Sequence, residues 1–203
     1  MKDTRSTLNA DGMLVHECIT RKRFTTLEHG DLTAVNGVVV HQTDSSTAES
    51  TLRGYKTASN GAHFLIARDG TIYQTASTKK RCYHVGRRIK SKCLELDGKD
   101  CADEAAVKLL SLKWAQQLKQ IDAHERKKEY PFRYPVNSDS IGIEIVGRDV
   151  DEKTYEEVST AQNQALQWLA GELNCHFGTD KDDYFRHPQV SYKNPGEAAS
   201  AKW

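Results

Sequence analysis

Apolar and polar residues along the chain follow two periods, which predict β-strands interleaved with α-helices. Short apolar runs rich in β-branched residues, bounded by turn-forming residues, predict strands at 37–41, 63–67 and 141–146. The turn Arg68-Asp69-Gly70-Thr71 predicts a hairpin that joins the second strand to residues 71–74. We expect these strands to form the central sheet of the molecule.

Apolar residues spaced three and four positions apart predict the helices. Three are expected, at 48–58, 105–121 and 158–173. Thr154 and Glu157 have the spacing of a capping box ahead of the third helix, and Gly178 is expected to end it. Strands interleaved with helices indicate an α/β or α+β fold, a single-domain mixed central β-sheet flanked by helices.

The length of 203 residues suits one domain with a full hydrophobic core. Residues 1–30 show little periodicity and are predicted to be an N-terminal arm or capping segment. Residues 31–203 are expected to form the main domain, which a divergent insertion at about 87–135 interrupts. Residues 127–137, with two prolines, are predicted to be a surface loop where substrate contacts are expected.

The balance of charge argues against two classes of partner. Lys and Arg number 29 against 28 Asp and Glu, so no net field draws the protein to nucleic acid or to an anionic membrane. No apolar run approaches the roughly 20 residues of a transmembrane helix. The first ten residues are polar and charged, so no export signal is visible and we expect synthesis in the cytoplasm.

The cysteines number five, which does not impose a disulfide framework and is compatible with a reduced cytosol. Cys93 and Cys101 flank a short polar loop that a bridge could close in an oxidising compartment. No C-x-x-C pair occurs, which argues against zinc binding by cysteine.

Two histidines suit a metal site. His41 ends the apolar run of the first strand where the chain becomes polar, and His187 lies on a separate segment, between Arg186 and Pro188. Either histidine taken alone is more often structural. A catalytic zinc takes three protein ligands and leaves the fourth position for a water, whose pKa it lowers to roughly 7.

The chain resembles the zinc-dependent N-acetylmuramoyl-L-alanine amidases of the type-2 amidase and peptidoglycan-recognition-protein superfamily. The resemblance covers about 38–198 and implies that His41 and His187 are zinc ligands. Five segments carry it, in this order: the strand ending at His41, Gly61-Ala62-His63-Phe64-Leu65-Ile66, His84-Val85-Gly86, Ser140-Ile141-Gly142-Ile143-Glu144, and His187 followed by Lys193-Asn194-Pro195-Gly196.

The third ligand is where this chain departs from the family. The family has an Asp or Cys directly before a Pro-Gly, and Asn194 stands there instead. Glu197, ten positions after His187, lies within the family's range and supplies the missing negative charge. We therefore favour Glu197 over Asn194, with loss of zinc as the remaining alternative.

Glu144 is a carboxylate among Ile and Val residues of a strand, so it is expected to be either paired or functional. The resemblance implies that Glu144 is the general base, which takes a proton from the water and gives it to the leaving amine. A salt-bridged structural carboxylate is the alternative. The resemblance also implies that Lys193 stabilises the oxyanion of the tetrahedral intermediate.

Two further histidines are candidate substrate-binding residues. His63 either faces the site or packs in the layer beside it. The resemblance places His84 at the floor of the groove, in contact with the peptide or the glycan. Some relatives have a catalytic tyrosine at the position of Ala62, so this chain is expected to depend on Glu144 instead.

The resemblance implies a hydrolase that cleaves the amide between N-acetylmuramic acid and L-alanine in peptidoglycan. The alternative is a module that binds the muramyl peptide without cleaving it, as superfamily members without a full zinc triad do. Asn194 favours the binding module, whereas Glu144 and Lys193 favour the enzyme. We favour the enzyme, because a binding module has no use for a base beside an oxyanion clamp.

Three biological roles fit this activity: a cytosolic recycling amidase, a phage endolysin, and an antibacterial effector delivered by a secretion system. The last would have an immunity protein as its partner. The divergent ligand loop and the cysteine-bearing insertion favour the effector or the endolysin. We expect a monomer that acts on the cell wall after delivery or lysis.

Overall fold

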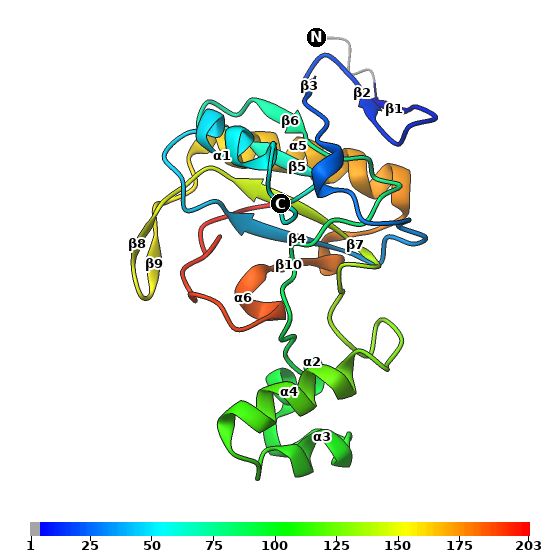
Figure 1. Ribbon diagram of the computed structural model, residues 1–203, viewed down its shortest axis with the longest axis vertical. Helices are drawn as coiled ribbons and strands as arrows, with labels where there is room; N and C mark the ends of the chain where they lie inside the picture. The colour runs from blue at the N-terminus through cyan, green and yellow to red at the C-terminus, as the bar shows by residue number, and fades with distance from the viewer. Residues whose placement is uncertain (1–4) are drawn as a thin grey trace.

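A mixed six-stranded sheet forms the centre of the computed structural model, which describes residues 5–203 (Figure 1). Four neighbouring strands, β10-β4-β7-β5, pair in parallel, and β6 forms an antiparallel hairpin with β5. The strands in spatial order are β10 (Tyr184–Arg186), β4 (Gly37–Gln42), β7 (Ser140–Ile145), β5 (Phe64–Ile66), β6 (Ile72–Gln74) and β3 (Ile19–Arg21). The predicted mixed sheet and its hairpin are confirmed.

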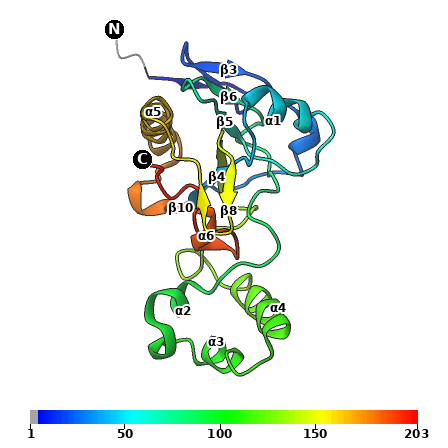
Figure 2. The ribbon, with the colours of Figure 1, turned by 90° about the vertical axis from the view of Figure 1, so that its left-hand side faces the viewer.

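Alternation along the strands gives the sheet two different faces. Val38 and Val40 of β4 point to one face and pack with the apolar side of α5 (Thr160–Phe177) in the main core. Val39 points to the other face, against a second apolar cluster that includes Val85 and Phe185. Figure 2 shows α5 on one side of the sheet and α1 (Ala48–Tyr55) on the other. The face away from α5 is the one that carries His41.

Helix α5, which packs in the main core, begins and ends at residues with clear capping signals. Ser159 caps α5 and forms a capping box with Gln162, and Gly178 ends the helix in the left-handed region at φ 73°. The capping box predicted at Thr154 and Glu157 is wrong, because Thr154–Tyr155 form strand β9, which pairs with β8 (Asp149–Asp151) as a short hairpin. The short helix α6 (His187–Val190) follows β10 directly.

The described part of residues 1–30 packs against the sheet instead of extending from it. Strand β3 is the edge strand beside β6, and Met13 and Leu27 are fully buried. The remaining elements are the hairpin β1 (Thr7–Leu8) and β2 (Leu14–Val15), and the 3₁₀ helices η1 (Thr25–Leu27) and η3 (Lys181–Asp183). The first four residues of the expected arm lie outside the described residues.

The expected insertion at about 87–135 is a group of short helices below the sheet (Figures 1 and 2). They are α2 (Lys92–Asp97), η2 (Gly98–Asp100), α3 (Glu104–Leu109) and α4 (Trp114–Glu125). The single helix expected over 105–121 is therefore two, because Lys113 has an extended backbone (φ −59°, ψ 141°) that breaks the helix between them. None of the helices among residues 5–203 has the length and apolarity required to span a membrane.

Candidate active site

The register of the parallel strands brings the principal candidates to one edge of the sheet. His41 of β4 lies opposite Glu144 of β7, so both side chains point to the same face. Val40 pairs with Arg186 of β10, and His187 therefore follows that strand next to His41. Ligand sites form at the carboxyl ends of parallel strands because several chain turns meet there.

Glu197 joins the two histidines from the loop that follows α6. Its Oε1 lies 2.9 Å from Nδ1 of His187 and 3.4 Å from Nδ1 of His41. The loop is held against the end of β4, because the backbone N–H of Ala198 donates to Oε1 of Gln42 at 2.8 Å. All three side chains are buried, and their ligand atoms lie within 4.8 Å of one another.

The chain of hydrogen bonds from Ser140 through His84 determines the tautomer of His41. Oγ of Ser140 donates its only proton to the carbonyl of Val136 at 2.6 Å, so it accepts from Nε2 of His84 at 3.2 Å. Nδ1 of His84 then accepts from Nε2 of His41 at 3.1 Å. Nδ1 of His41 is left with a lone pair that faces Glu197.

His187 has the same arrangement. Its Nε2 donates to the carbonyl of Val85 at 3.2 Å, which leaves a lone pair on Nδ1. Two lone pairs and one carboxylate oxygen therefore face a common point, and none of the three groups offers a proton to the others. A cation at that point would satisfy all three.

The charge states of these groups also suit a metal. Burial lowers the pKa of His41 to about 4, so its imidazole is neutral near pH 7. Burial alone would raise the pKa of Glu197, but His187 and His41, when they carry a proton toward it, lower that pKa to about 2, so the carboxyl group is ionised near pH 7. Metal ligation requires neutral imidazoles and an ionised carboxylate.

Asn194, the alternative third ligand, points away from the histidines. Its Nδ2 donates to Oδ1 of Asp149 at 3.1 Å and to the carbonyl of Asp151 at 2.7 Å, and its Oδ1 accepts from the N–H of Gly196 at 2.9 Å. The amide of Asn194 therefore holds the loop that carries Glu197 against the β8–β9 hairpin by hydrogen bonds. The structure brings Glu197 to the histidines in place of Asn194.

Glu144 lines a cavity of about 490 Å³ together with His41, His187 and Glu197. Its Oε2 is buried and has no hydrogen-bond partner among the described residues. Burial, and then the negative charge of Glu197, raise the pKa of Glu144 to about 8, whereas Lys193 acts in the opposite direction. Lys193 lines the same cavity. A carboxylate of this kind, held without a salt bridge, is suited to exchanging a proton with a bound molecule.

Of the two positions expected for His63, the structure has the one in the layer beside the cavity, and His84 lines the cavity as expected. His63 is fully buried outside the cavity, where Nδ1 accepts from the N–H of Gly142 at 3.0 Å and Nε2 donates to the carbonyl of Lys80 at 2.8 Å. His63 therefore links β7 to the segment at Lys80 by hydrogen bonds and is not placed to contact a substrate. His84 lines the cavity, but both its ring nitrogens are engaged in orienting His41.

Two hydroxyl groups of the cavity are absent from the sequence prediction. Thr51 and Tyr55 lie one turn apart on α1, and both hydroxyls are buried without a partner in the described chain. Their spacing of four positions places them on one helix face. Tyr55 occupies an apolar helical position in the sequence, and only the packing of α1 against Leu65 and Val146 shows that Tyr55 also lines the cavity.

The sequence profile of the family described as N-acetylmuramoyl-L-alanine amidase matches residues 31–199. No curated protein matches the chain significantly in sequence.

Solved structures share the fold. A selenomethionine derivative of AmpD is 19% identical with a TM-score of 0.54, and the match covers 94% of this chain and 96% of that one. The catalytic domain of XlyA is 17% identical with a TM-score of 0.52, covering 86% and 87%. The amidase AmiD from E. coli is 16% identical with a TM-score of 0.50, covering 77% and 49%.

Proposed function

Since the chain belongs to the N-acetylmuramoyl-L-alanine amidase family, we propose that it is a zinc-dependent enzyme that hydrolyses the amide between N-acetylmuramic acid and L-alanine in peptidoglycan. One observation carries the proposal. His41, His187 and Glu197 direct three ligand atoms at one point, in the cavity where Glu144 has a buried oxygen that no group of residues 5–203 pairs with.

The three donors fit a zinc ion in number and type. Two imidazole nitrogens and one carboxylate oxygen are a known catalytic set, which leaves one position of a tetrahedral ion open. Ligand atoms about 2.1 Å from a tetrahedral ion lie roughly 3.4 Å apart, and the Nδ1 of His41 is 3.4 Å from Oε1 of Glu197. When bound, zinc would polarise the substrate carbonyl and make water acidic enough to attack near neutral pH.

The chain's own residues supply the proton transfers and the charge stabilisation. Glu144 in its ionised form, which the positive charge of a bound zinc would favour, takes a proton from the attacking water and passes it to the departing amine of L-alanine. Lys193 lines the cavity, and its ammonium stabilises the negative charge that develops on the carbonyl oxygen. His84 keeps the Nδ1 lone pair of His41 directed at the metal point, through the 3.1 Å hydrogen bond between the two rings.

The rival function is a module that binds muramyl peptides without cleaving them. It is favoured by Asn194, the neutral residue at the family's ligand position. Two observations favour the enzyme over it: Glu197 takes the position beside both histidines, and Glu144 has a buried oxygen without a partner in the part of the chain that the structure describes. A binding module would gain nothing from such an oxygen, because an unsatisfied buried acceptor costs about 1–3 kcal/mol.

The setting of the activity is part of the proposal. Cys93 and Cys101 form a disulfide, and disulfides persist in oxidising compartments and are rare in the cytosol. The bridge supports action outside the cytosol, as an endolysin or a delivered antibacterial effector, over a recycling role. We propose a monomer, with an immunity protein as partner in the effector setting.

The test is metal content measured together with release of stem peptides from purified peptidoglycan. We expect about one zinc per chain, and loss of both zinc and peptide release in His41→Ala and in His187→Ala. His16→Ala, on the N-terminal hairpin far along the chain from the site, is the control. Stoichiometric zinc in His187→Ala would remove that residue from the ligand set.

A further inference from the structure

The helical insertion carries an aromatic cleft of about 290 Å³ between α2, α4 and the chain after α6. Trp114 and Tyr192 meet there edge to face, with ring centroids 5.4 Å apart. Trp114 is 60% exposed although it is large and apolar. Exposed aromatic rings in a cleft indicate a binding surface, since water does not stabilise them there.

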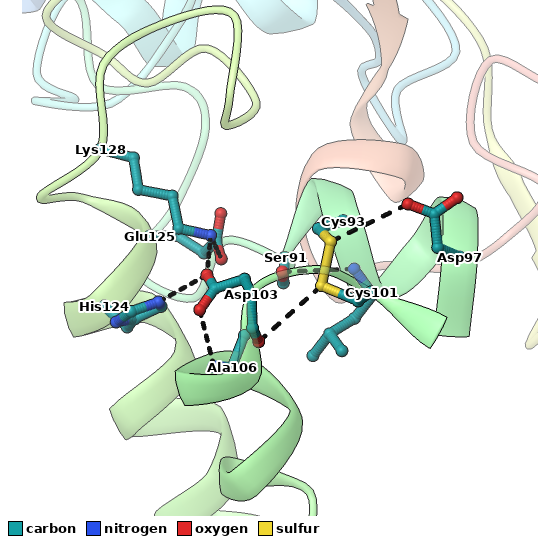
Figure 3. Close-up of a disulfide and its surroundings, with 10 residues drawn as sticks. Ser91, Cys93, Asp97, Cys101, Asp103, Ala106, His124, Glu125 and Lys128 are labelled. Carbon is teal, nitrogen blue, oxygen red and sulfur yellow. Dashed lines mark hydrogen bonds and ion pairs between the residues drawn. A yellow bond between two sulfur atoms is a disulfide. The ribbon is translucent and has the colours of Figure 1, made fainter. Parts of the chain in front are cut away.

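A disulfide and an ion-pair cluster hold the helices around the cleft together. The Cys93–Cys101 disulfide ties the start of α2 to the chain that enters α3, as Figure 3 shows. In the same view Oδ2 of Asp103 accepts from Nε2 of His124 at 2.7 Å and pairs with the ammonium of Lys128 at 2.6 Å, which joins α3 to α4. The two sides of the cleft are therefore held in a fixed relation before any ligand binds.

The insertion is also joined to the loop that carries the active-site residues. Ile89 forms a β-bridge with Ser191, and the N–H of Lys90 donates to the carbonyl of Val190 at 2.8 Å. Tyr192 of the cleft is thus the immediate neighbour of Lys193 in the active-site cavity. Consecutive residues therefore line the aromatic cleft and the active-site cavity.

Hollows of the surface connect the two places. Tyr192 borders the cleft and a small hollow that it shares with Arg87 and Lys193. Arg87 and Lys193 also border an open groove of about 730 Å³, which His84 shares with the active-site cavity. Shared lining residues therefore link the active-site cavity, through the groove and the small hollow, to the cleft at Trp114.

We propose that the insertion is a glycan-binding element, and that the cleft at Trp114 holds the sugar strand of the peptidoglycan whose muramyl amide lies in the active-site cavity. A pyranose ring has an apolar face that packs on an aromatic ring, and hydroxyl groups at its edge. Trp114 and Tyr192 offer the rings, and Glu95 and Gln117 line the cleft with groups that can bind hydroxyls. This inference rests on the proposed function, because the same polymer must carry both groups.

The test compares two substrates in the full, disulfide-bonded chain. Trp114→Ala should bind intact sacculi about 10-fold more weakly and release stem peptides from them correspondingly more slowly at low substrate concentration. The same variant should cleave a soluble muramyl tripeptide, which has no glycan strand, at the rate of the unmodified protein. Trp114→Phe, which keeps a ring, should lie between the two.

Leu96→Ala is the matched control, because Leu96 is a large apolar residue of the same insertion, 70% exposed and outside the cleft. It should change neither assay. Unchanged binding and cleavage of sacculi by Trp114→Ala, or an equal loss on the soluble peptide, would overturn the glycan site. Failure of the unmodified protein on both substrates would instead overturn the proposed amidase function.

Discussion

Glu144 has a buried carboxylate oxygen with no partner among the described residues, in the cavity that His41 and His187 also line. We expect Glu144→Gln to lower turnover of muramyl peptide by about 10²- to 10⁴-fold, the usual contribution of a general base. The amide has the same shape, so zinc content and binding to peptidoglycan should be retained. Steady-state release of stem peptides, with metal analysis of the same sample, measures both.

The matched control for this change is Glu152→Gln, which removes an exposed carboxylate in the β8–β9 turn. It should leave turnover unaffected. If Glu144→Gln turned over substrate at a nearly normal rate, Glu144 would be a structural carboxylate and another group would have to move the proton.

Glu197 and Asn194 can be separated by metal titration. Glu197→Ala should weaken zinc binding strongly, because two neutral imidazoles would then face the dication without a negative charge. Asn194→Ala should weaken it less, since the amide of Asn194 holds the β8–β9 hairpin and not the metal point. A sharp gain of zinc affinity in Asn194→Asp, with no effect of Glu197→Ala, would reverse the assignment.

At the scale of elements, the insertion is the part whose stability depends on one covalent bond. The Cys93–Cys101 bridge closes a loop of sequence separation 8. The chain-entropy account of such a loop gives a stabilisation of about 2–3 kcal/mol. The double variant Cys93→Ser/Cys101→Ser should therefore open α2 and η2 more often, while the sheet keeps its stability.

Hydrogen exchange resolved by peptide measures this local effect, as faster exchange over 92–109 than over the central strands. Cys18→Ser is the control, because Cys18 is exposed and free. Equal exchange of 92–109 in the double variant and in the unmodified protein would mean that the helices hold together without the bridge.

At the scale of the whole molecule, buried histidines make stability depend on pH. Burial lowers the pKa of His41 and of His63 to about 4, and lowers that of His84 as well. The unfolded chain binds protons at these imidazoles from about pH 6.5 downward, whereas the folded protein does not until about pH 4. Acidification through this window therefore favours the unfolded state.

Glu144 acts in the opposite direction, because its raised pKa of about 8 makes the folded protein bind a proton that the unfolded chain has released. The three imidazoles change the free energy of unfolding more between pH 7 and pH 5 than the one carboxyl group does. We expect the melting temperature of the metal-free protein in chelator to fall by roughly 5–10 °C between pH 7 and pH 5. Thermal unfolding followed by circular dichroism measures it, and Glu144→Gln should give the steeper decrease. A melting temperature that stayed constant or rose would contradict the buried neutral histidines.

Much of the fold follows from local patterns. The β-branched runs at 37–41 and 141–146 could only be buried strands, and the turn at Arg68–Thr71 has the residues of a hairpin. The departures occur where local signals compete. A continuous helical period covers 105–121, yet the backbone breaks at Lys113 because two short helices pack separately. Thr154 and Glu157 have the spacing of a cap, but pairing with β8 places Thr154 in a strand.

The candidate residues of the site could be selected from the sequence, because the motifs by which the chain resembles the amidase family mark the segments that carry them. Their roles depend on long-range packing, which no local pattern contains. Parallel pairing places His41 opposite Glu144, separated by more than a hundred positions in the chain. Hydrogen bonds across the sheet direct His84 toward His41, tie His63 to backbone and turn Asn194 away from the metal point. Residue types are local properties of the sequence, whereas distances and proton positions in the site arise only when the distant segments pack together.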